Sequence, residues 1–134
     1  MAADMRTLWL RRVLLVKALV TVLVWGLPSL LGPLSLLAFL QVPIPVDPIY
    51  LRLFGGACTA WGVAYWLARK DPVRNVAILW AGVVDNALPT AAIVLIGLTR
   101  GVSSIFLWIS ALLTGTFCVL FLVLMPREEQ TAAT

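Results

Sequence analysis

An aspartate and an asparagine stand side by side in the middle of a long apolar run, and a proline follows one turn later. These residues are Asp85, Asn86 and Pro89, in the run 76–98. Pro89 lacks a backbone N–H, and its ring crowds the carbonyl of the residue four positions earlier, which is Asp85. Ionisable groups inside a bilayer are costly and usually face a cavity, a polar partner or a pathway. Asp85 is therefore the leading candidate for proton or cation chemistry, or for a buried hydrogen-bond network.

Other reactive side chains are scarce. The chain has no histidine, and its two cysteines, Cys58 and Cys118, fall in different apolar runs, so neither a CxxC motif nor zinc-ligand spacing occurs. Its four apolar runs also lack a closely spaced acidic pair, and the chain has no glycine-rich phosphate loop. General acid–base catalysis would depend on Asp85 alone. We expect no catalytic residue, no metal and no cofactor, and hence no enzyme.

The composition is that of a membrane protein. Hydrophobic residues make up 62% of the chain and charged residues 12%, against about 45–50% and 25% in soluble domains. Each of four apolar runs has about the 17–25 residues that a spanning helix needs. These runs are 13–31, 49–67, 76–98 and 102–125. We predict an all-α integral membrane protein, an antiparallel four-helix transmembrane bundle that forms one domain over residues 1–134.

Prolines and glycines mark irregularities in this plan. Gly32 can end the first helix, and Pro33 suits the first turn of a new one, so a short interfacial helix is expected between spans one and two. Pro28 and Pro89 lie at similar depths in spans one and three. We expect both prolines to kink their helices.

The net charge of +4 is distributed asymmetrically. Eight of the ten basic residues fall on one side of the predicted bundle, and only Arg52 and Arg100 fall on the other. Under the positive-inside rule, both termini are predicted to be cytoplasmic. The charge is therefore assigned to topology or to lipid headgroups rather than to nucleic acid. The residues so assigned are Arg11, Arg12, Lys17, Arg69, Lys70 and Arg74.

Polar side chains recur at one depth in the four runs. At about 1.5 Å per residue, Asp85 lies roughly 16 Å from the inner basic boundary, and threonines in the other runs lie about 14–20 Å from it. A shared polar layer would contain Thr21, Thr59, Asp85, Asn86 and either Thr114 or Thr116. In the alternative, each threonine bonds a carbonyl of its own helix.

The partner of Asp85 is not evident from the sequence. Lys17 lies about 8 Å nearer the cytoplasm and Arg52 about 10 Å nearer the outside. Either side chain would have to reach inward, although such side chains usually extend toward water. We therefore expect a neutral, hydrogen-bonded Asp85. Small residues in span two also predict a close helix contact at Gly56 and Ala60, in a stripe that continues to Ala64 beside a neighbouring stripe of Gly55 and Thr59.

Two short motifs carry a resemblance to a known group. Residues 51–57 read LRLFGGA and open span two, and residues 68–74 read ARKDPVR between spans two and three. With four spans in about 130 residues, the chain resembles the small bacterial DoxX-like four-helix membrane proteins. This resemblance implies a four-helix fold and a bacterial inner (plasma) membrane, but little chemistry. Asp85 and Asn86 are not part of it.

Two functions remain open. The first expectation is a non-catalytic accessory, scaffold or assembly subunit, whose partners are membrane lipids and either other membrane-protein subunits or a second copy of the chain. The alternative is a small transporter or lipophilic-ligand binder that uses the polar layer around Asp85. The sequence identifies neither a ligand nor a partner complex.

Overall fold

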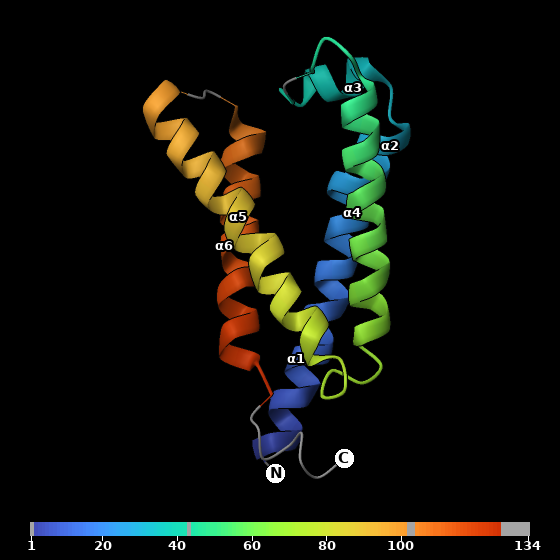
Figure 1. Ribbon diagram of the computed structural model, residues 1–134, viewed down its shortest axis with the longest axis vertical. Helices are drawn as coiled ribbons and strands as arrows, with labels where there is room; N and C mark the ends of the chain where they lie inside the picture. Colours follow the sequence, from blue (N-terminus) through green and yellow to red (C-terminus); the bar gives the residue numbers. More distant parts are fainter. Residues whose placement is uncertain (1, 43, 102–103, 127–134) are drawn as a thin grey trace.

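The computed structural model describes residues 2–42, 44–101 and 104–126 (Figure 1). All regular structure in these ranges is helical. The elements in chain order are α1 (Ala2–Val20), a π-helical segment (Thr21–Gly26), α2 (Leu27–Leu31), α3 (Leu34–Phe39), α4 (Ile49–Ala68), α5 (Val76–Arg100) and α6 (Ile105–Leu124).

Three helical stretches are long and apolar enough to cross a membrane. They are Met5–Leu31, which runs from α1 through the π-segment to α2, and the helices α5 and α6. Helix α4 has 20 residues, but it carries Arg52 and several glycines and is not among the three. Three of the four predicted spans therefore combine the required length and composition.

The helices form two pairs. Helix α4 packs along α1, the π-segment and α2, and α5 packs along α6. Figure 1 shows the pairs meeting near the start of α1 and diverging toward the end that holds α3. The buried core lies where the pairs meet and includes Leu10, Leu14, Tyr65, Leu79 and Phe121. Contacts between α4 and α5 are few, so this core holds the pairs together.

The two prolines expected to kink helices have different surroundings. Pro28 lies in the first turn of α2, directly after the π-segment, so the helical pattern changes before the proline is reached. Pro89 lies inside α5, which continues as an α-helix on both sides of it. A π-segment widens the helix locally and is frequent at functional sites.

The predicted short helix after Pro33 is present as α3. The guanidinium of Arg52 donates to the carbonyls of Ser29, at 3.0 Å, and of Gly32, at 2.7 Å. It thereby satisfies backbone groups at the end of α2 that have no partner within that helix. The side chain of Arg52 is thus engaged in joining α4 to α2.

The closest approach of α4 to the first helix occurs at Gly55. A Cβ atom there would overlap the backbone nitrogen of Leu30 and lie 2.7 Å from the carbonyl carbon of Ser29. At Gly56 the nearest atom would be the Leu30 side chain at 4.0 Å. The stripe that begins at Gly55 therefore forms this contact. The close contact expected at Gly56 and Ala60 is wrong, since Gly56 has room beside it and Ala60 is exposed.

We predict that Gly55→Ala destabilises the fold and that Gly56→Ala does not. The added methyl group at residue 55 meets backbone atoms that cannot move independently, at an expected cost of about 1–3 kcal/mol. At residue 56 the same change has room and gains up to about 1 kcal/mol in helix propensity. Thermal unfolding of both variants in one detergent measures the difference. Equal stability of the two variants would contradict the helix contact described here.

Candidate binding site between the helix pairs

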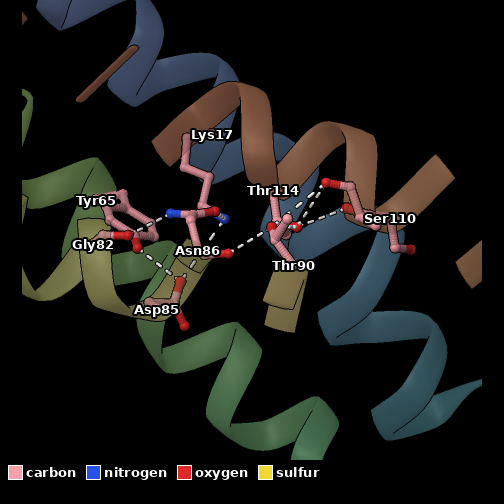
Figure 2. Close-up of polar contacts among 9 residues, drawn as sticks. Lys17, Tyr65, Gly82, Asp85, Asn86, Thr90, Ser110 and Thr114 are labelled. Carbon is pink, nitrogen blue, oxygen red and sulfur yellow. Dashed lines mark hydrogen bonds and ion pairs between the residues drawn. The ribbon is translucent and has the colours of Figure 1, made fainter. Parts of the chain in front are cut away.

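A lysine is buried where the two helix pairs meet. Lys17 is only 2% exposed, and its Nζ donates a 2.6 Å hydrogen bond to Oδ1 of Asn86 (Figure 2). The same Nζ lies 3.8 Å from Oδ2 of Asp85. This position differs from the predicted one, which grouped Lys17 with Arg11 and Arg12 at the membrane surface. It also brings Lys17 to Asp85 as the cationic partner that the depth count had argued against.

Aromatic rings explain why Lys17 extends inward. Its ammonium lies 5.3 Å from the ring centre of Trp25, 5.4 Å from that of Tyr65 and 5.2 Å from that of Phe117. The negative face of an aromatic ring attracts a cation, most strongly where water is excluded. Rings from the π-segment, α4 and α6 thus complement the amide and carboxylate from α5.

Tyr65 also binds the carboxylate of Asp85. Its hydroxyl donates a 2.8 Å hydrogen bond to Oδ2 of Asp85, and its ring is fully buried. The ring packs at a tilt against Trp61 and Phe121, with centre distances of 5.6 and 5.7 Å. Gly82 provides the space, because a Cβ atom there would lie within 2.9 Å of both the Tyr65 and Phe121 rings.

Asn86 has both ends of its amide satisfied. Oδ1 accepts from Lys17, and Nδ2 donates to the carbonyl of Gly82 at 2.6 Å. These two bonds fix the orientation of a side chain that is completely buried. The Asn86 carbonyl also accepts a 2.8 Å bond from the Thr90 hydroxyl.

A second polar group lies next to this cluster. The hydroxyls of Thr90 and Thr114 are 2.7 Å apart, and Thr114 also donates to the Ser110 carbonyl at 2.8 Å. The indole nitrogen of Trp25 donates to Oγ of Ser110 at 3.0 Å. This last bond joins the π-segment to α6, and therefore one helix pair to the other.

The predicted polar layer is only partly assembled. Asp85 and Asn86 belong to the central cluster, and Thr114 connects to it through Thr90. The Thr59 hydroxyl donates to the Gly55 carbonyl of its own helix at 2.8 Å, which is the alternative considered for the threonines in the sequence analysis. Oγ1 of Thr21 is buried and has no hydrogen-bond partner among the described residues.

Several residues of this site were only weakly indicated by the sequence. Lys17 is the only lysine inside an apolar run, but a straight-helix depth count placed it too far from Asp85. Tyr65 lies near the end of its run, where tyrosine usually indicates the membrane interface. Gly82 lies one turn before Asp85 and Asn86, and this spacing was the available indication of a close aromatic contact.

A cavity of about 180 Å³ adjoins the cluster. It lies between the helix pairs, and its wall includes residues from α1, the π-segment, α4, α5 and α6. An engineered cavity of about 150 Å³ in another protein binds benzene, so this space suits a molecule of one ring. Lys17, Asp85 and Cys58 line it together with the aromatic side chains Trp25, Phe54 and Trp61.

The donor set does not fit a metal ion. Within the part of the chain that the structure describes, no three histidine, cysteine, aspartate or glutamate side chains come together. The arrangement instead offers an apolar chamber with one carboxylate in its wall and a compensating cation behind that carboxylate.

No protein-family model matches this chain, and no curated protein or solved structure shows significant similarity to it. The resemblance to DoxX-like proteins rests on the two short sequence motifs.

We predict that Lys17→Met destabilises the protein by about 3 kcal/mol. The substitution leaves Asp85 and Asn86 without their partner in an apolar interior, and breaking one side of a buried pair is costly. The double variant Lys17→Met with Asp85→Leu should recover most of this loss, because no lone charge remains. Lys70→Met is the control, since Lys70 is exposed, and it should change stability by less than about 0.5 kcal/mol. Denaturation in detergent compares these three variants with the wild-type protein. If Lys17→Met were as stable as Lys70→Met, the pairing of Lys17 with Asp85 would be contradicted.

Proposed function

We propose that this chain is a four-helix membrane protein that binds a small lipophilic molecule in the cavity between its helix pairs. The observation that carries the proposal is the Lys17–Asp85 pair at the wall of an apolar cavity. Burying an ion pair and leaving a cavity both reduce stability, and a binding role would explain why the protein has them. A non-catalytic accessory subunit, the first expectation from the sequence, requires neither feature and becomes the second candidate.

The cavity is unusual for a structural interface. Protein interiors are close-packed, and voids much larger than a water molecule are few. The neighbouring helix contact at Gly55 shows that these helices pack tightly where they only need to adhere. A space of about 180 Å³ bordered by paired charges is therefore consistent with selection for an occupant rather than for stability.

The membrane arrangement belongs to the same proposal. Helix α4 has spanning length and packs along the first stretch, so we place it in the membrane beside the three apolar stretches. The loop between α4 and α5 carries Arg69, Lys70 and Arg74 and lies at the same end as the start of α1 (Figure 1). We assign this end, with both termini, to the cytoplasmic side of a bacterial inner membrane, and lipids are its surrounding partners.

Labelling of single cysteines tests this orientation. In a background with Cys58 and Cys118 replaced by alanine, Val46→Cys should react with an impermeant thiol reagent added to intact cells. Lys70→Cys should react only after the cells are opened. Both positions are exposed in the structure. Reaction of Lys70→Cys in intact cells would overturn the assignment.

Binding is tested with fluorobenzene, which matches the size of the cavity. We predict that the ¹⁹F resonance of fluorobenzene shifts on titration into detergent-solubilised protein, and that Cys58→Phe abolishes this shift. The larger ring at residue 58 fills the cavity, because Cys58 lines it.

The matched control is Cys118→Phe. Cys118 is also half-buried in a helix, but it lies in a separate groove between α5 and α6 and does not line the cavity. Cys118→Phe should bind fluorobenzene like the wild-type protein. Equal ¹⁹F shifts for Cys58→Phe and the wild type would mean that only detergent takes up the probe, and the proposal would fail.

A further inference from the structure

We infer that the molecule held in the cavity is uncharged and carries a hydroxyl group that donates a hydrogen bond to Asp85. This inference rests on the proposed binding function and specifies its ligand class. The observation that supports it is that the polar groups in the cavity wall differ in how accessible they are to a ligand.

The charges of the wall are already compensated. Lys17 and Asp85 are the charged residues that line the cavity, and they offset one another. An anionic ligand would meet Asp85, and a cationic one would compete with Lys17 for it. A second charge in this apolar space would lose its hydration without gaining a partner of its own.

The polar group that a ligand reaches is Asp85. Its side chain is 28% exposed, whereas Lys17 is 2% and Thr21 3% exposed. Lys17 lies behind three aromatic rings and already donates to Asn86, so an acceptor on the ligand has little access to it.

One oxygen of Asp85 remains available. The contacts with Tyr65 and Lys17 both involve Oδ2, as the dashed lines in Figure 2 show. Oδ1 accepts no hydrogen bond from any residue that the structure describes. A carboxylate oxygen can only accept, so the ligand has to bring the donor. A neutral hydroxyl supplies one without adding charge.

The rest of the wall selects for an apolar body. Trp25, Phe54, Trp61 and Phe106 border the cavity, and its volume is close to that of a benzene-binding cavity. The cavity is partly open, so an apolar chain attached to the ring can extend from it. The ligand class is thus an alcohol or phenol whose remaining surface is apolar.

A comparison of two isomers tests the proposed hydrogen bond separately from binding in general. 4-Fluorobenzyl alcohol and 4-fluoroanisole have the same atoms, but only the alcohol has a hydrogen-bond donor. We expect the wild-type protein, followed by ¹⁹F NMR with the Cys58→Phe signal subtracted, to bind the alcohol at least about tenfold more tightly, the factor expected for one hydrogen bond to a charged carboxylate. 4-Fluorobenzylammonium and 4-fluorobenzoate should bind more weakly than either isomer.

The double variant Lys17→Met with Asp85→Leu tests whether the preference for the alcohol depends on Asp85. It removes the pair together and should bind both isomers alike. Equal affinity of the wild-type protein for the two isomers, tighter binding of either ion, or a preference for the alcohol that persists in the double variant would overturn the inference while leaving the cavity a binding site. Failure of all four probes to bind would instead overturn the proposed function. If the double variant does not fold, the comparison of isomers and ions in the wild-type protein decides.

Discussion

A lysine ammonium buried between helices has to be satisfied by its neighbours, and the arrangement of this protein follows from that requirement. Lys17 on α1 receives an amide and a carboxylate from α5 and ring faces from the π-segment, α4 and α6. Because several elements contribute to one ammonium, they have to meet at one level. Helices α4 and α5 have few other contacts, so the Tyr65–Asp85 hydrogen bond is a main connection between the two pairs at this depth.

The cavity is a consequence of where these connections lie. The pairs are joined at the apolar core around Leu14 and Phe121 and at the Lys17 cluster, and they diverge beyond it (Figure 1). The Trp25–Ser110 bond provides a second connection across the space. Trp25 and Thr21 both belong to the π-segment, and both line the cavity. The irregular part of the first helix therefore contributes to the site as well as to the fold.

The elements of the fold were largely predictable, because they depend on local properties. Apolar runs of spanning length predicted the long helices, and Gly32 with Pro33 predicted α3. Asp85 and Asn86 were recognisable because polar groups in an apolar run have to find partners. The contact stripe in α4 was predicted wrongly, at Gly56 instead of Gly55. A step of one residue rotates the contact face by about 100°, and both stripes contain small residues.

The site itself depends on distances between helices, which the sequence does not contain. A depth count for straight helices separated Lys17 from Asp85 by about 8 Å, but it omitted the length of the lysine side chain and the three rings that receive it. Tyr65 was unremarkable because its partner lies twenty residues away on another helix. These residues become a site only when Gly82 lets the aromatic rings approach α5.

The Lys17–Asp85–Asn86 geometry is most directly tested by solid-state NMR of the protein in lipid bilayers, with ¹⁵N in the lysine side chains and ¹³C in the aspartate and asparagine side chains. Lys17 should show dipolar coupling to the side-chain carbons of both Asp85 and Asn86, as the 3.8 Å and 2.6 Å nitrogen–oxygen separations require. Loss of these couplings in Lys17→Met would assign them. A wild-type lysine spectrum with no coupling to either carbon would place Lys17 at the lipid headgroups and contradict the account.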